Sequence, residues 1–193
     1  IKIDTFDLPP TSSVQISHFT TSHPDGVYGP GETIFIDVHF KDSLTGEDAA
    51  VYVDDRNGTP TLNLGDDINH YGSNKDATYI SGSGTDTLRF QYTVQSGDQS
   101  DDLKLEYTNP ISLHGAIISD APIGTPGKNV NVTGDEAYIP LGGNSDSLQS
   151  AGDIEIIPNA RLPIHETFEF DTSSWEIDNH HFSVNDAALN PLI

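Results

Sequence analysis

Strict alternation of apolar and polar residues is the feature that most limits how this chain can fold. The clearest run, Thr33–Phe40, places Ile34, Ile36, Val38 and Phe40 on one face. Phe35, Asp37 and His39 lie on the other face. A period of two residues indicates β-strands, and helical periodicity is nearly absent. The predicted strands are Val14–Phe19, Thr33–Phe40, Ala50–Val53, Thr61–Leu64, Ala77–Ser81, Thr87–Val94, Leu103–Tyr107, Ile111–Gly115, Ala137–Ile139 and Gly152–Ile157.

Turn signals rich in Gly, Pro, Asn and Asp separate these runs. Examples are Gly29-Pro30-Gly31 and Ser96-Gly97-Asp98. Many short strands at such spacing predict an all-β sandwich or barrel, and about ten strands favour a two-sheet Greek-key sandwich. Helix is expected only as a single turn within Ser145–Ala151.

The two flanks of this region have a similar form. Ile1–Pro10 and Ile154–Pro163 both read as an apolar-charged-apolar strand, a break, and then Leu-Pro. That recurrence, at a spacing of about 150 residues, is typical of a tandem array. We therefore expect residues 1–12 to be a linker or the end strand of a preceding unit, residues 13–160 to form one sandwich, and residues 161–193 to begin a following element. Because the chain starts at Ile1 without Met or a signal peptide, we expect it to be a piece of a longer protein.

Charge and composition exclude several classes of protein. The 193 residues include 8 Lys and Arg against 30 Asp and Glu, a formal net charge of −22. Repulsion makes nucleic acid and anionic membranes poor partners for such a chain. With no cysteine there is no thiol catalysis and no disulfide framework. No apolar run approaches the roughly 20 residues that span a bilayer.

Three segments together resemble a bacterial Ig-like (cadherin-like) repeat. Thr21–Ile34 follows the pattern T-S-x-x-D-G-x-Y-x-x-G-D/E-x-I with which such repeats open. The likeness continues through Gly58–Leu64 and is strongest in Ala77–Asp98, which runs into Asp101-Asp102-Leu103. It covers roughly residues 13–120. The connection Lys41–Arg56 and the region 121–152 are longer than the pattern usually has.

The resemblance implies an Ig-like sandwich in an array of an extracellular adhesin or surface filament. Such repeats space and stiffen the array, often with bound calcium, and have no enzymatic activity of their own. The expected partners are neighbouring repeats or subunits of the same assembly, and possible further partners are cell-surface glycans or proteins. The expected location is extracellular or at the cell surface.

Clusters of carboxylates provide candidate calcium ligands. Calcium takes six to eight oxygen ligands, which loops supply well because carboxylates and carbonyls converge there. The turn from Asp25 to Glu32 and the loop from Ser96 to Asp102 are expected to share one end of the sandwich, and Asp4 could approach it from the linker. The predicted ligands are Asp4, Asp25, Glu32, Asp98, Asp101 and Asp102. A solvated acidic surface remains the simpler interpretation of any single acid.

Other functions have weaker signals. A carbohydrate-binding module of a secreted protein is the alternative, although no coplanar set of exposed aromatics is evident. A hydrolase is a third possibility, but with so many acids a suitable pair could always be found. The histidines lack the spacing of a metal site. Two sequons, at Asn57 and Asn131, are candidate glycosylation sites.

Overall fold

The computed structural model describes residues 12–65, 75–106, 110–133 and 137–159. The chain divides into two compact units, Ile1–Arg161 and Leu162–Ile193, and every described residue belongs to the first. The predicted linkers at 1–12 and 161–193 lie outside the described residues, apart from Ser12. Both remain predictions.

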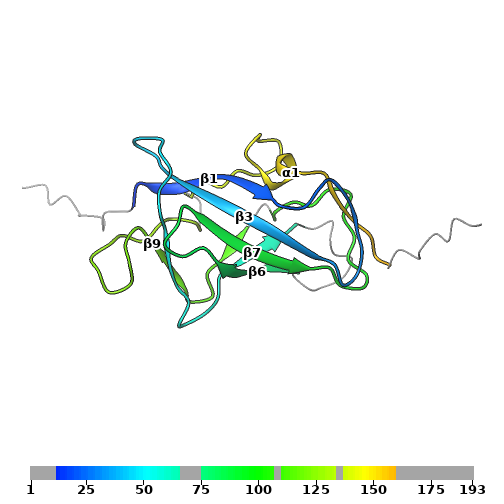
Figure 1. Ribbon diagram of the computed structural model, residues 1–193, viewed down its shortest axis with the longest axis horizontal. Coiled ribbons are helices and arrows are strands. Elements are labelled where there is room, and N and C mark those ends of the chain that lie inside the picture. Colours follow the sequence, from blue (N-terminus) through cyan, green and yellow to red (C-terminus); the bar gives the residue numbers. More distant parts are fainter. Residues whose placement is uncertain (1–11, 66–74, 107–109, 134–136, 160–193) are drawn as a thin grey trace, which may run out of the picture. The chain divides into compact units, whose positions relative to one another are not determined.

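A six-stranded antiparallel sheet forms the main body of the described unit (Figure 1). Its strand order is β1-β3-β7-β6-β5-β8, so β1 and β8 are the edge strands. The strands are β1 (Val14–Thr21), β3 (Thr33–Asp42), β5 (Thr61–Leu64), β6 (Lys75–Ser81), β7 (Thr87–Thr93) and β8 (Ile111–Ser112).

Two small sheets complete the described strands. β2 (Gly26–Tyr28) pairs in parallel with β10 (Ile154–Ile156), and β4 (Tyr52–Asp54) pairs antiparallel with β9 (Ile117–Ser119). The single helical turn, α1 (Leu148–Ala151), lies beside β1 (Figure 1). Just before it, the Asp146 carbonyl accepts a hydrogen bond from the Phe19 amide.

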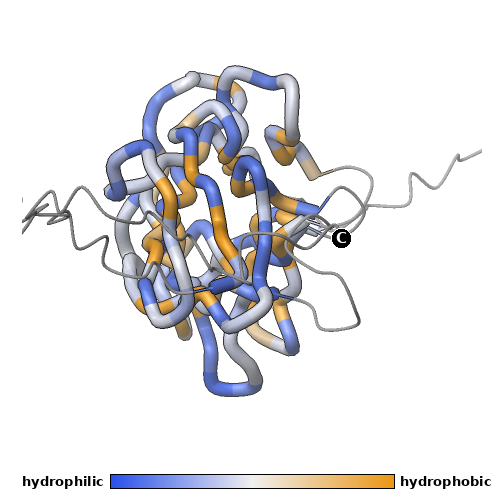
Figure 2. The backbone as a smooth tube through the Cα atoms, turned by 90° about the vertical axis from the view of Figure 1, so that its right-hand side faces the viewer, coloured by the Kyte–Doolittle hydropathy of each residue, from blue (hydrophilic) through white to orange (hydrophobic). Residues whose placement is uncertain are grey.

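One hydrophobic core joins the large sheet to the small ones. On β3 the predicted inner face is confirmed, because Ile34, Ile36, Val38 and Phe40 are all at most 2 % exposed. Burying each such side chain stabilises the fold by about 1.5–3 kcal/mol. The core extends to residues of the small sheets and their neighbours, such as Val53, Ile118, Val130, Ile154 and Ile156. Figure 2 shows the resulting alternation of hydrophobic and hydrophilic residues along the backbone.

A β-bulge divides β1 into two parts. Ile16 lies opposite Phe40, but the next partner of His39 is His18, so Ser17 is an extra residue. The extra residue reverses the alternation, and Phe19, which simple alternation places beside Ser17, is 2 % exposed in the core. A bulge of this kind re-aims the side chains that follow it.

The first and the last described residues lie near opposite ends of β3. Near Asp42, at the end that we call the leading end, the Ser12 hydroxyl donates to Asp120 and the Ser13 hydroxyl donates to Asp42. At the other end, which we call the trailing end, the Gly97 amide donates to the Pro158 carbonyl. Ten residues of strand at about 3.3 Å each separate these ends by about 30 Å. In Figure 1 the blue start and the orange end of the described trace lie at opposite ends of β3.

The predicted all-β class is confirmed for the described residues, and six predicted strands match to within two residues at each end. These are Val14–Phe19, Thr33–Phe40, Ala50–Val53, Thr61–Leu64, Ala77–Ser81 and Thr87–Val94. Gly152–Ile157 shortens to β10, and the predicted helical turn is confirmed as α1.

Other strand predictions differ from the structure. Leu103–Tyr107 makes only an isolated bridge at Leu105 among its described residues, and Ala137–Ile139 is not a strand. Ile111–Gly115 stops at Ser112, because His114 and Gly115 turn the backbone to φ values of 51° and 94°. The short strands β2 and β9 were not predicted, since three residues carry too little alternation to detect.

Candidate functional site

The predicted ligand Glu32 closes a tight turn at the trailing end. The Glu32 amide donates to the Gly29 carbonyl, and Gly31 has a φ of 91°. Proline at the second turn position and glycine with positive φ at the third define a type II turn. The Glu32 carboxylate accepts a 2.6 Å hydrogen bond from the Gly29 amide. One carboxylate oxygen of Glu32 is therefore engaged in holding its own turn.

Among the predicted ligands that the structure describes, Asp98 is the most deeply buried, at 1 % exposure. Its Oδ1 lies 2.7 Å from Lys75 Nζ. Its Oδ2 accepts hydrogen bonds from the Tyr92 hydroxyl and, at 2.6 Å, from the Gln95 amide. Burial and the neighbouring Asp98 carboxylate raise the pKa of Tyr92. Both oxygens of Asp98 thus serve the fold, joining the loop after β7 to β6.

A second group of carboxylates lies at the other end of β2 and β10. Asp25 Oδ1 accepts a 2.9 Å hydrogen bond from the Asp153 amide, at the point where these two strands begin. Burial, followed by the Asp153 charge, raises the pKa of Asp102. Asp102 Oδ1 is buried with no hydrogen-bond partner, while its Oδ2 is 3.5 Å from the Gln149 amide nitrogen. Asp153 was not predicted from the sequence.

The predicted calcium ligands therefore divide into two groups. Three-residue strands separate Asp25 and Asp102 from Glu32 and Asp98 by about 10 Å. Asp101 is exposed, and Asp4 lies outside the described residues. Within the described ranges, no group of three or more His, Asp or Glu side chains is arranged to hold a metal ion. The calcium prediction itself remains open.

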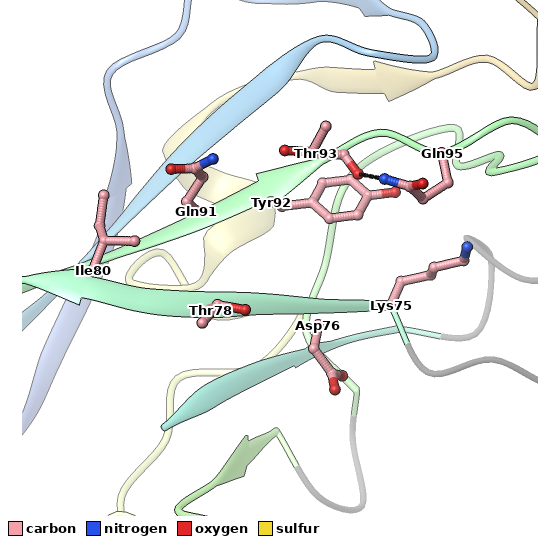
Figure 3. A pocket seen from close by; sticks show the side chains of 8 residues that line it. All are labelled: Lys75, Asp76, Thr78, Ile80, Gln91, Tyr92, Thr93 and Gln95. Carbon is pink, nitrogen blue, oxygen red and sulfur yellow. Dashed lines mark hydrogen bonds between the residues drawn. The ribbon is translucent and has the colours of Figure 1, made fainter. Parts of the chain in front are cut away.

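An open cavity of about 500 Å³ lies beside β6, β7 and the start of the loop after β7 (Figure 3). Its lining is mainly polar: Lys75, Asp76, Thr78, Ile80, Gln91, Tyr92, Thr93 and Gln95. Burial raises the pKa of Asp76. Tyr92 is its only aromatic lining residue among those described, and it is 2 % exposed. This cavity therefore does not display the flat aromatic surface that a carbohydrate-binding module uses.

Polar pairs on the outer face of the large sheet were missed from the sequence. Asp37 and Arg89 are direct cross-strand partners and form two hydrogen bonds of 2.8 and 2.7 Å. His18 and His39 stack on each other, with ring centroids 4.2 Å apart. Alternation could place Asp37 and His39 on the outer face, but only the strand register pairs them with Arg89 and His18.

The two candidate glycosylation sites differ in access. Asn57 is exposed in a turn in which the Gly58 amide donates to the Asp55 carbonyl. Asn131 is half-buried between Val130 and Val132, which are both in the core. Glycosylation at either position remains a prediction.

Comparison with known proteins adds no identification. No protein-family model, curated protein sequence or solved structure matches the chain. Among the described residues, none of the helices is long and apolar enough to cross a membrane.

Proposed function

We propose that the chain is a non-catalytic structural repeat of an extracellular adhesin or surface filament. In this proposal residues 13–160 form an Ig-like (cadherin-like) sandwich that spaces and stiffens an array. The observation that carries the proposal is the separation of about 30 Å between the leading end, where Ser12 lies, and the trailing end, where Pro158 lies. A unit that is joined at opposite ends extends an array by its own length.

The strand directions suit a unit that bears tension. A pull on Ser12 away from the trailing end acts along β1, which is antiparallel to β3 over Val14–Thr21. A pull on Asn159 acts along β10, which runs parallel to β2. Both pulls load several backbone hydrogen bonds together in shear.

Neighbouring repeats are the proposed partners, because the array would place one unit directly after another. Residues 1–12 and 161–193 would connect the described unit to its neighbours or add a strand to a neighbouring sheet edge. The net charge of −22 keeps such a surface solvated and disfavours polyanionic partners.

Calcium at the trailing half of the unit is part of the proposal. A bound cation would provide a partner for the buried Oδ1 of Asp102. It would also favour the charged form of this carboxyl, whose pKa is raised first by burial and then by the Asp153 charge. Asp102 and Asp153 would hold the ion with Asp25 nearby, and carbonyls or water would supply the remaining oxygens. With so few carboxylates already in position, we expect weak binding in the range of extracellular modules, about 10⁻⁴–10⁻³ M.

Single-molecule pulling tests the proposed mechanical role. Ser12→Cys and Asn159→Cys introduce the only thiols of a chain that contains no cysteine, so handles attach at unique points. We expect cooperative unfolding that releases about 50 nm of chain, at 3.3–3.6 Å for each extended residue.

A second pulling geometry is the matched control. Handles on Ser12→Cys and on Leu44→Cys, which replaces a side chain 85 % exposed beyond β3, both attach at the leading end. This pair peels β1 from β3 one hydrogen bond at a time, and we expect unfolding at a lower force than with handles at 12 and 159. Equal forces in the two geometries would contradict the proposed role.

A further inference from the structure

Two histidines on adjacent strands form a stacked pair on the outer face of the large sheet. His18 of β1 lies directly opposite His39 of β3. Their ring centroids are 4.2 Å apart, and the ring planes differ by 1°. Both side chains are half-buried. The bulge at Ser17 creates this pair, because without the extra residue the alternation of β1 would not place His18 opposite His39.

Hydrogen bonds to both ring nitrogens hold the side chain of His39 in place. The Thr87 hydroxyl donates its single proton to Asp86 Oδ1 at 3.0 Å, so it accepts a hydrogen bond from His39 Nδ1, also at 3.0 Å. His39 Nε2 is 2.8 Å from the Thr20 hydroxyl, and when the ring is neutral it accepts a hydrogen bond from that hydroxyl. The neutral form of His39 therefore carries its proton on Nδ1. Through it, the ring of His39 connects β1, β3 and β7.

The surrounding charges act on His39 in both directions. Burial, followed by the charge of His18, lowers the pKa of His39, while Asp37, Asp86 and Asp48 act against this shift. Asp37 is already bound to Arg89 of β7. Lys41, two residues further along β3, shares the outer face with His39. The carboxylates therefore only partly offset the repulsion between two protonated rings 4.2 Å apart.

We propose that the stacked His18–His39 pair makes the attachment of the edge strand β1 sensitive to mild acid. The neutral pair holds β1 on the sheet through the stacked rings and the Thr20 hydrogen bond. Addition of a proton to His39 places a positive charge in the stack, ends the hydrogen bond that Nε2 accepts from the Thr20 hydroxyl, and loosens β1. Because β1 bears the tension in the proposed array, the same step would weaken a loaded unit at low pH, although the pair itself does not depend on that role.

The direction of the pH effect follows from proton linkage. The pKa of His39 lies below 6.5 in the folded chain and at its ordinary value of 6.5 in the unfolded chain. On acidification the unfolded chain therefore takes up this proton first, so stability falls as the pH drops from 6.5 toward the folded value. Each unit of difference between the two pKa values raises the unfolded-to-folded ratio by up to tenfold.

Nuclear magnetic resonance of the full chain tests the pair directly. Titration of the imidazole signals from pH 8 to pH 4.5 gives the apparent pKa values of the pair. We expect His39 to titrate below 6.5. The variant His18→Phe keeps a ring on His39 but removes the second charge, so we expect it to raise the pKa of His39. Titration of His39 at or above 6.5 in the natural chain would overturn the proposal.

Hydrogen exchange and urea unfolding provide a readout of β1 itself. At pH 5.5 we expect faster amide exchange in β1 in the natural chain than in His18→Phe, with no difference at pH 7.5. The loss of stability between these pH values should also be smaller in the variant, and all other titrating groups are common to both chains. Identical pH profiles of the two chains would refute the inference, and they would leave the pulling experiment unaffected.

Discussion

The two faces of the large sheet are built from different interactions. On the inner face, Ile34 and Ile36 of β3 are fully buried in a core that also reaches the small sheets. On the outer face, the same strand presents Asp37 and His39, each bonded to side chains of adjacent strands. The inner face supplies most of the stability through burial. The outer face adds specific pairs that favour one register and respond to pH and salt.

The strongest test of this contrast removes core volume. Ile36→Ala leaves a cavity at a residue that is 0 % exposed, and we expect a loss of about 2–5 kcal/mol in the free energy of unfolding, measured in urea. The control is Gln91→Ala on the outer face, for which we expect a change within about 0.5 kcal/mol. Similar losses for the two variants would contradict the division between faces.

A buried carboxylate sharpens the comparison, because its polar contacts are shielded from water. Asp98→Asn keeps the size of the side chain but leaves Lys75 without its 2.7 Å partner. We expect a loss of about 1.5–3 kcal/mol, in the range of hydrogen bonds to charged groups. Asp101→Asn, at an exposed position of the same loop, is the matched control and should unfold like the natural chain. A loss below 0.5 kcal/mol for Asp98→Asn would contradict a structural role for this carboxylate.

The outer-face ion pair should matter less. The Arg89 side chain is 44 % exposed, whereas that of Asp37 is 11 % exposed, so water screens this ion pair from the Arg89 side. For Asp37→Asn we expect a loss of about 1 kcal/mol or less in the free energy of unfolding. Raising the salt concentration should reduce the difference from the natural chain further. If Asp37→Asn lost as much free energy of unfolding as Ile36→Ala, the outer face would contribute as much to stability as the core, which would contradict the comparison.

Calcium should have the smallest effect on stability. When its concentration equals the dissociation constant, calcium stabilises the folded chain by about 0.4 kcal/mol. For a chain of this size that corresponds to a rise of about 1 °C in melting temperature. Asp102→Asn should abolish the calcium-dependent rise, whereas Asp101→Asn should retain it. An unchanged melting transition with calcium and with EDTA would remove the ion from the proposed function.

Sequence patterns predicted local structure well where side-chain burial determines it. In β3, alternation identified both faces, since every second residue enters the core. Short strands such as β9 escaped detection because they are held by pairing with distant segments. The candidate site was harder to predict, because an acid at a turn can either bond to its own loop or remain available to a cation. Asp98 binds its own loop and Lys75, whereas Asp102 keeps one oxygen unpartnered, and only the folded contacts distinguish them.

The bulge in β1 has a consequence for sequence variation. The extra residue Ser17 changes which positions of β1 point into the core. Before it, the even-numbered Val14 and Ile16 do so, and after it the odd-numbered Phe19 does. Deletion of one residue here would turn either the aliphatic pair or the aromatic ring toward water. Insertions and deletions should therefore be rarer between Ile16 and Phe19 than in the loop after β3, where the exposed Leu44 has no such constraint.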